Sequence, residues 1–290
     1  MKVSGFAIAR NVIKADYPIK ESLLSIAPLC DEIIVAVGKS DDGTRDLIES
    51  LPIENLKIID TVWDDNLRIG GLVLSDETNK ALAAVSKESD WCFYIQADEC
   101  IHEDDLPIIK DSMKLNLTNY NVDGLLFNYK HFYGSYDYLG DSRKWYRNEI
   151  RIIRNNGKIK SWKDAQGFRT IQNEKLKVKK IEASIYHYGW VKSPEFQQVK
   201  QKQFHKLWHD DEKLSNYVSE GAEFDYSSID SLQIFNGTHP KLMLYRIANV
   251  NWKFTFDISK KKFTLKGWFL YYFEKYFSIR IGEYKNYKII

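Results

Sequence analysis

The residues best suited to chemistry stand just after an apolar run. Residues 91–95 are aromatic, thiol or aliphatic, and the carboxylates Asp98 and Glu99 follow within four positions. Such a run is typical of a strand buried on both faces. In an open α/β sheet, ligands bind beyond the carboxyl ends of the strands, where a carboxylate suits a hard cation. Asp98 is therefore a candidate metal contact. The alternative is a solvated turn that precedes the next helix.

Composition indicates an ordinary soluble globule. The chain has 290 residues, 44% of them hydrophobic and 28% charged, enough for one large domain or a domain with an appendage. The formal charge of +2 gives no overall nucleic-acid signature. The charge is uneven, because residues 251–290 hold nine Lys/Arg against three Asp/Glu, a net charge of +6. We expect no nucleic-acid partner.

The cysteines and the apolar runs predict a cytoplasmic protein. Cys30, Cys92 and Cys100 cannot all pair and form no CxxC motif, so we expect reduced thiols. The apolar run at residues 6–9 is too short for a signal peptide. No stretch approaches the roughly 18 apolar residues of a membrane span.

Apolar runs alternate with helical patterns over the first hundred residues. Strands are predicted at 3–9, 32–37 and 56–60, with helices at 19–26 and 44–51 between them. The spacing of Leu74, Ala81, Leu82 and Val85 predicts another helix before the 91–95 run. This βαβαβ order predicts an α/β fold with a mainly parallel mixed sheet.

The second half is predicted to add further strands and helices. Acidic residues at 103–105 suit the first turn of a helix. Strands are expected at 124–129, 149–154 and 181–190, and residues 131–145 are predicted as a long aromatic loop over the sheet. Helical patterns follow at 196–208 and 265–277, the latter with a broad aromatic face.

Four landmarks, in this order, resemble family 2 glycosyltransferases of the GT-A fold, in particular the branch that acts on bacterial lipopolysaccharide and related glycans. They span roughly residues 1–210: Asp31 to Val35 with Ser40 to Thr44, Trp63 to Asn66 with Thr78 to Leu82, Gln96 to Glu99, and Tyr186 to Tyr188. The resemblance implies a GT-A domain over 1–215 and a helical accessory segment over 216–290.

The resemblance also implies a divalent metal, Mn²⁺ or Mg²⁺, on a nucleotide-diphospho-sugar. Asp98 matches the last position of the family's Asp-x-Asp, whereas Gln96 replaces its first acid. His187 matches a late histidine and is the candidate imidazole ligand, its alternative being a hydrogen-bonded histidine among tyrosines. The donor-binding candidates are Arg10, Asp41, Asp42, Asp65, Lys80, Gln96, Ala97 and Asp98.

The acid that reads the nucleobase in the family is missing, since the matching stretch is Val37-Gly38-Lys39. Asp41 or Asp42 substitutes for it, or main-chain groups hold the base. Asp42 also suits a turn and helix cap.

Inverting transfer to a hydroxyl requires a carboxylate that accepts the proton. Asp164 lies where relatives carry an acid and is ranked first, with Glu149 and Glu99 in reserve. The prediction is thus a metal-dependent inverting glycosyltransferase that acts on a bacterial surface glycan or a lipid-linked precursor. The alternatives are a non-catalytic sugar-binding relative and a nucleotidyltransferase.

The basic, aromatic tail is typical of a peripheral membrane contact. Its alternatives are packing of the helix at 265–277 onto its own domain or onto a second copy in a homodimer.

Overall fold

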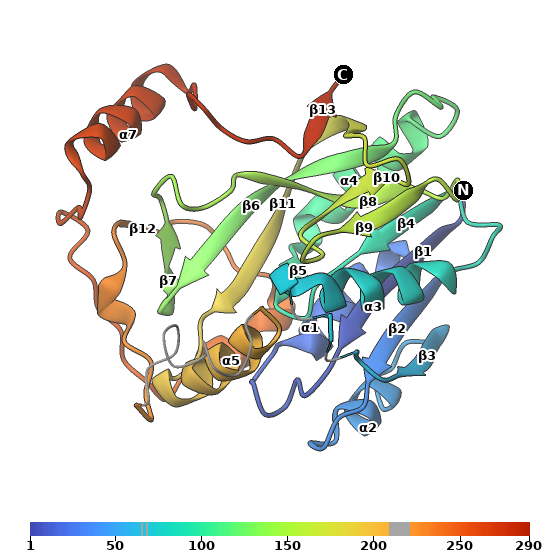
Figure 1. Ribbon diagram of the computed structural model, residues 1–290, viewed down its shortest axis with the longest axis horizontal. Coiled ribbons are helices and arrows are strands. Elements are labelled where there is room, and N and C mark those ends of the chain that lie inside the picture. The colour runs from blue at the N-terminus through green and yellow to red at the C-terminus, as the bar shows by residue number, and fades with distance from the viewer. Residues whose placement is uncertain (65, 68, 209–220) are drawn as a thin grey trace.

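The computed structural model describes residues 1–64, 66–67, 69–208 and 221–290 (Figure 1). Within these residues, one mixed sheet of eleven strands forms the centre of the molecule, and a separate two-stranded hairpin lies beside it. The predicted α/β class is confirmed, and the architecture is consistent with the GT-A fold.

The first part of the chain builds a parallel half-sheet in the order β3-β2-β1-β4. Its elements are β1 (Val3–Ala9), α1 (Ile19–Ile26), β2 (Glu32–Gly38), α2 (Thr44–Glu49), β3 (Leu56–Thr61), α3 (Leu72–Ala83) and β4 (Trp91–Tyr94). These bounds confirm the predicted βαβαβ order. The chain reverses its direction of travel across the sheet between β1 and β4, so their carboxyl ends form a topological switch point.

The second half of the sheet is largely antiparallel. β8 joins β4, then β6, β7 and β12 follow, while β11 pairs with β5, β6 and β13. These strands are β5 (Glu99–Ile101), β6 (Gly124–Tyr133), β7 (Ser135–Gly140), β8 (Asn148–Arg154), β11 (Leu176–Trp190), β12 (Leu232–Ile234) and β13 (Tyr287–Ile289). The helices are α4 (Leu106–Leu115), α5 (Pro194–Lys206), α6 (Leu244–Ala248) and α7 (Leu265–Phe277).

The core occupies both faces of the sheet. Trp91 and Phe93 of β4 pack into one apolar cluster, and Cys92 and Tyr94 pack into another. All four side chains are fully buried, so β4 is covered on both faces as its sequence predicts. The three cysteines are free thiols, also as predicted.

The predicted loop at residues 131–145 is wrong over its first ten residues. Gly134, at a φ of +72°, joins β6 to β7 in a hairpin. A Cβ at Gly134 would lie 2.6 Å from the ring of Phe254, so this turn favours glycine for both its φ and its space. The aromatic residues of this stretch belong to strands whose side chains pack on the C-terminal segment.

The two-stranded hairpin that lies beside the main sheet was not predicted from the sequence. β9 (Ile159–Trp162) and β10 (Gly167–Thr170) pair antiparallel, and the four residues between them include Asp164. Both strands are short and carry polar residues, so neither gives a clear two-residue apolar period.

The C-terminal segment adds to the same sheet, because β12 pairs with β7 and β13 with β11. The predicted division at residue 215 lies outside the described residues and stays a prediction. Among the described residues, no helix is both long enough and apolar enough to cross a membrane.

Candidate functional site

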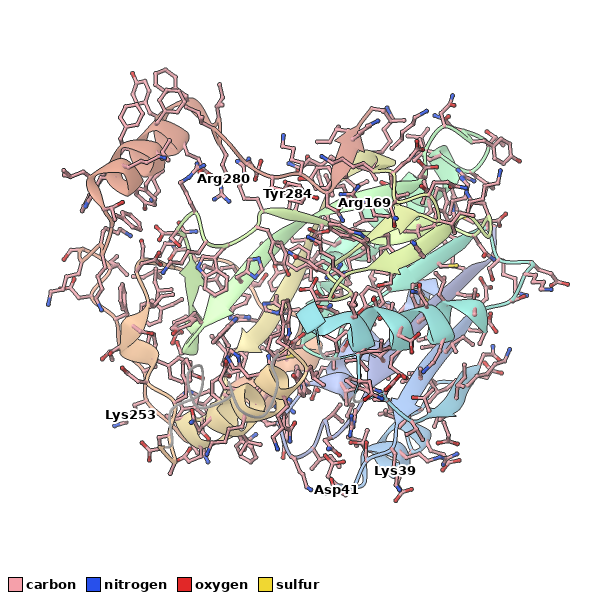
Figure 2. All side chains as sticks on the ribbon, in the orientation of Figure 1. Lys39, Asp41, Arg169, Lys253, Arg280 and Tyr284 are labelled. Atoms are coloured by element: carbon pink, nitrogen blue, oxygen red, sulfur yellow. The ribbon has the colours of Figure 1, made fainter. Side chains whose placement is uncertain are left out.

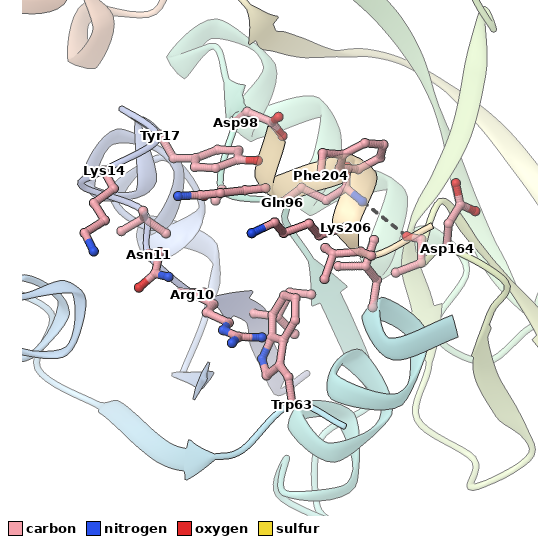
Figure 3. A pocket seen from close by; sticks show the side chains of 18 of the residues that line it. Arg10, Asn11, Lys14, Tyr17, Trp63, Gln96, Asp98, Asp164, Phe204 and Lys206 are labelled. Atoms are coloured by element: carbon pink, nitrogen blue, oxygen red, sulfur yellow. Dashed lines mark hydrogen bonds between the residues drawn. The ribbon is translucent and has the colours of Figure 1, made fainter. Parts of the chain in front are cut away.

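A cavity of about 530 Å³ opens at the carboxyl ends of β1 and β4, the topological switch point of the parallel half-sheet (Figure 3). Helix α5 forms one wall. The cavity is lined by Ile8, Ala9, Arg10, Asn11, Val12, Lys14, Tyr17, Trp63, Leu74, Tyr94, Gln96, Ala97, Asp98, Asp164, Ala165, Gln203, Phe204, Lys206 and Leu207. Ligands of open α/β sheets bind at such a position.

Five predicted site residues meet in this cavity although they lie up to 154 positions apart: Arg10, Gln96, Ala97, Asp98 and Asp164. Among the described residues, the other candidates do not line this cavity. The structure therefore separates the predicted site residues that share this cavity from those described residues that make their contacts elsewhere.

Gln96 ties the end of β4 to the hairpin turn. Its side-chain Nε2 donates to the carbonyl of Ala165 at 3.2 Å (Figure 3). The main-chain carbonyl of Gln96 accepts from Ser22 Oγ at 2.7 Å. An amide can donate here, which a carboxylate cannot. The Gln96 side chain thus links two elements that line the cavity.

Asp98 is buried, with 8% of its surface exposed, and its Oδ2 accepts a hydrogen bond from Lys200 Nζ at 2.9 Å. Burial alone would raise the pKa of Asp98, but the ammonium of Lys200 outweighs it and holds the pKa well below its ordinary value. Asp98 is therefore a carboxylate whose charge is matched by a cation within the fold.

His187 lies beside Asp98, as the sequence predicts, with Nε2 3.7 Å from Asp98 Oδ2. Its Nδ1 is 3.2 Å from His131 Nδ1, and the other nitrogen of His131 lies 2.9 Å from the carbonyl of Tyr146. Burial lowers the pKa of His187, which favours the neutral ring. This placement also matches the alternative interpretation, a hydrogen-bonded histidine in an aromatic cluster.

The two predicted metal ligands are both engaged by other side chains. Among the described residues, no group of three His, Cys, Asp or Glu side chains lies close enough together to hold a divalent ion. Asp98 is bonded to an ammonium, and His187 is engaged by His131. The metal role of Asp98 and His187 remains a prediction of the family resemblance.

Glu99 is locked into the core. Its two oxygens receive the Nε and Nη2 of Arg151 at 2.9 and 2.7 Å, and Tyr129 Oη also donates to it. Both charged side chains are fully buried. A carboxylate held by a fork of two hydrogen bonds is suited to positioning the strand end.

Asp164 occupies the turn between β9 and β10. Its neighbours Lys163 and Ala165 have φ of +54° and +59°, a left-handed conformation that is costly for residues other than glycine. Burial raises the pKa of the Asp164 carboxyl. A strained turn thus places Asp164, with a carboxyl of increased basicity, in the lining of the cavity.

Glu149 lines a different cavity of about 200 Å³, beside Arg147 and Glu283. Burial raises the pKa of Glu149 to about 8, so its carboxyl is largely protonated at neutral pH. Its position outside the larger cavity makes it a weaker base candidate than Asp164.

The remaining donor-binding candidates have contacts elsewhere. Asp42 accepts from the backbone of Ile13 and Lys14 and caps Thr44, which matches its alternative role in a turn. Asp41 pairs with Lys14 at the outer edge of the molecule (Figure 2). Lys80 pairs with two acids of its own helix, Asp76 and Glu77. Asp65 lies outside the described residues.

A tryptophan stands where the base-reading acid is missing. A Cβ at Gly38, the last residue of β2, would lie 2.3 Å from Trp63 Nε1, so glycine makes room for this ring. The guanidinium of Arg10 lies 5.3 Å from the centre of the same ring. Both Trp63 and Arg10 line the cavity and form a flat wall.

Sequence reasoning missed the contribution of α5. Ser193 caps this helix by accepting from Phe196 N, and Pro194 begins it, a favoured first position. The helix brings Lys200 to Asp98 and Lys206 to the cavity. One signal in the sequence could have indicated this buried role, because Lys200 directly follows Val199 within an apolar helical pattern.

No family model matches the chain, and no curated protein matches it in sequence. Solved structures do match. A crystal structure of S. aureus TarS is 18% identical with a TM-score of 0.40, and the match covers 70% of this chain and 39% of that one. TarS 1–349 in complex with UDP is 17% identical with a TM-score of 0.39, covering 76% of this chain and 70% of that one.

A third match is glucosyl-3-phosphoglycerate synthase from Mycobacterium tuberculosis, in complex with Mn²⁺, UDP and phosphoglyceric acid. It is 20% identical with a TM-score of 0.30, covering 46% of this chain and 43% of the synthase. All three TM-scores are below 0.5 and all three identities are 20% or less, so these matches carry no argument about the function of this chain.

Proposed function

We propose that this protein is a glycosyltransferase that moves a sugar from a nucleotide-diphospho-sugar to a hydroxyl group with inversion. The observation that carries the proposal is the cavity at the switch point, which brings Trp63, Arg10, Lys206 and Asp164 together. A flat aromatic ring, two cations and a basic carboxyl suit the base, the diphosphate and the acceptor hydroxyl respectively.

The proposed reaction is a single displacement. The acceptor oxygen attacks the anomeric carbon, the bond from that carbon to the phosphate oxygen breaks, and the nucleoside diphosphate leaves with the bonding electrons. Asp164 accepts the hydroxyl proton, because an alcohol is a poor nucleophile near neutral pH. The raised pKa of Asp164 brings its basicity closer to the operating pH.

We assign the nucleobase to the face of Trp63. Stacking of a base on an aromatic side chain contributes about 1–3 kcal/mol. Trp63→Ala should therefore weaken nucleotide diphosphate binding by roughly 5- to 150-fold. Isothermal titration with UDP measures this, with Trp268→Ala on α7 as the control. Equal affinity in the wild type and Trp63→Ala would refute the assignment.

The proposed acceptor is a bacterial surface glycan or a lipid-linked precursor at the inner face of the cytoplasmic membrane. The polar side of α7 is tied to the β7–β8 connection, through Tyr271 to Asp141 and Glu274 to Arg143. Helix α7 lies at the edge of the molecule (Figure 1), and its aromatic side is exposed, with Phe269 65% and Tyr276 84% exposed. This exposed face and the +6 charge of residues 251–290 support a peripheral contact with anionic lipid.

Vesicle sedimentation tests the membrane contact. Binding should be stronger to phosphatidylglycerol than to phosphatidylcholine vesicles and should fall in the double variant Phe269→Ser, Tyr276→Ser. Leu115→Ser, at an exposed position of α4, is the control. If both variants bind like the wild type, α7 does not meet the membrane, and a concentration-dependent mass in solution would indicate a second copy instead.

Release of nucleotide from a panel of nucleotide-diphospho-sugars, UDP-glucose included, tests the enzymatic function itself. A transferase slowly releases nucleotide to water when no acceptor is present, whereas a sugar-binding module binds the donor without turnover. A nucleotidyltransferase would instead release pyrophosphate from a nucleoside triphosphate. The loop after β1 disfavours this second alternative, because it holds Ala9-Arg10-Asn11 and no glycine run.

A further inference from the structure

The positive charge around the cavity comes from the protein itself. Lys206 is the last residue of α5 and lines the cavity. Figure 3 shows its side chain extended between Gln96 and Arg10, with the ammonium near the middle of the space. Arg10 and Lys14 line the same cavity from the loop after β1. Lys14 is already paired with Asp41, so Lys206 and Arg10 are the cations that bring positive charge from two elements to a space of a size that suits a small ligand.

The acid predicted to bind a metal is already neutralised. Lys200 Nζ lies 2.9 Å from Asp98 Oδ2 and 2.6 Å from the carbonyl of Gly189, and it sits 4.9 Å from the centre of the Tyr17 ring. Lys200 is only 8% exposed. A buried ion pair with additional hydrogen bonds is costly to break, since either partner would be left as an uncompensated charge.

A second buried lysine, Lys192, lies at the same place, and burial together with the Lys200 ammonium lowers its pKa to about 7. Lys192 is fully buried, donates to the carbonyl of Asp16, and lies 4.7 Å from the centre of the Tyr17 ring. Two lysines therefore share one phenol ring, with Asp98 as the acid in direct contact. A divalent cation that bound Asp98 would have to displace the Lys200 ammonium, which would then be left buried without its counter-charge.

We propose, on the basis of the function proposed above, that Lys206 contacts the donor diphosphate and that donor binding needs no divalent metal. Asp98 and Lys200 then form a neutral pair that supports the cavity, while Lys206 and Arg10 stabilise the charge on the leaving group. Lys206 belongs to the last turn of α5, so its position depends on how that helix is held, which includes the bonds from Lys200 to Asp98 and to the carbonyl of Gly189. Helix α5 thereby forms one wall of the cavity and, through Lys206, places a positive charge next to the donor diphosphate.

Calorimetric titration with UDP, in EDTA and separately with Mn²⁺, tests the proposal on the full chain. The wild type should bind UDP in EDTA with an affinity within about threefold of that with Mn²⁺. Lys206→Ala should weaken binding about 10- to 100-fold, as expected for loss of a charge-assisted hydrogen bond. Lys206→Arg should retain most of the affinity, since it keeps the charge. Lys202→Ala is the matched control, because Lys202 is exposed on the same helix and does not line the cavity.

The outcomes separate this proposal from the function on which it rests. UDP binding that requires Mn²⁺ would overturn the metal-free proposal while leaving the transferase intact. Equal affinity of Lys206→Ala and the wild type would overturn the role of Lys206 alone. A failure to bind any nucleotide diphosphate in a panel, with or without Mn²⁺, would overturn both. Near-ultraviolet circular dichroism of each variant verifies that it is folded.

Discussion

Asp98 and Asp164 line the same cavity, and their surroundings differ (Figure 3). Asp98 follows a buried strand and bonds to the ammonium of Lys200, which lowers its pKa. Asp164 stands in a strained hairpin turn, where burial raises its pKa. One acid is suited to fixing charge and the other to accepting a proton. Environment thus assigns different roles to two side chains of the same type.

The largest effect is expected for the acid in the turn. Asp164→Asn should reduce sugar transfer by about 10²- to 10⁴-fold, the usual contribution of a general base. UDP affinity should stay within a few-fold of the wild type, since the amide keeps the size of the side chain. Turnover of a donor panel, together with calorimetry, measures both quantities. Asp111→Asn, at an exposed position of α4, is the control.

The pH profile sharpens this prediction. Activity of the wild type should fall as the pH drops through the raised pKa of Asp164, and this limb should be absent from the residual activity of Asp164→Asn. Full transfer by this variant would remove Asp164 from the mechanism and bring Glu149 or Glu99 forward.

The acid at the strand end should instead affect stability. Asp98→Asn leaves Lys200 buried without a counter-charge and should lower the free energy of unfolding by about 3–5 kcal/mol near neutral pH. Because the folded-state pKa of Asp98 is depressed, its contribution is present above the unfolded pKa of about 4 and is lost as the pH falls below it. Urea unfolding at pH 7 and at lower pH measures this loss.

The exposed pair of Asp41 with Lys14 provides the control for Asp98, since Asp41→Asn should change stability little. If Asp98→Asn were as stable as Asp41→Asn, the ion pair with Lys200 would not be what holds Asp98 in its buried position.

Glu149 gives a third acid, which is buried without lining the cavity. Its folded-state pKa of about 8 lies above the ordinary value, so the folded state holds the proton more tightly than the unfolded state. Stability should therefore fall as the pH rises from about 4.5 to 8, by more than the roughly 1.4 kcal/mol of one pKa unit. Glu149→Gln should abolish this slope in unfolding measurements. A slope that persists in the variant would assign it to another group.

The smallest effect is expected at Gly71, which packs against the turn, with the adjacent Gly70 as its control. Gly70 and Gly71 both have positive φ, so alanine at either should cost about 1 kcal/mol of stability. A Cβ at Gly71 would lie 3.0 Å from Asp164 Cβ, whereas one at Gly70 would meet nothing within 4 Å. Gly71→Ala should therefore lower kcat as well, and Gly70→Ala should not. Equal kcat values would show that the contact with Asp164 does not position the base.

Local sequence determined the parallel half-sheet and the place of its acids. The apolar runs of β1, β2 and β4 predict strands because burial on both faces leaves a continuous apolar pattern that needs no distant partner to be recognised. Asp98 and Glu99 follow β4 directly, so their location at the carboxyl edge of the sheet follows from chain order. The helix over 265–277 was likewise predicted with its observed bounds, since its aromatic residues keep a helical spacing.

Only the tertiary structure decided what those acids do. Lys200 is 102 positions from Asp98, and Arg151 is 52 positions from Glu99, so neither partner leaves a local pattern near the acid. The β9–β10 hairpin that places Asp164 in the cavity is too short and polar to show a period. The pKa and the role of a buried acid depend on charged groups that folding brings within a few ångströms of it. The spacing of these groups along the sequence does not predict that proximity.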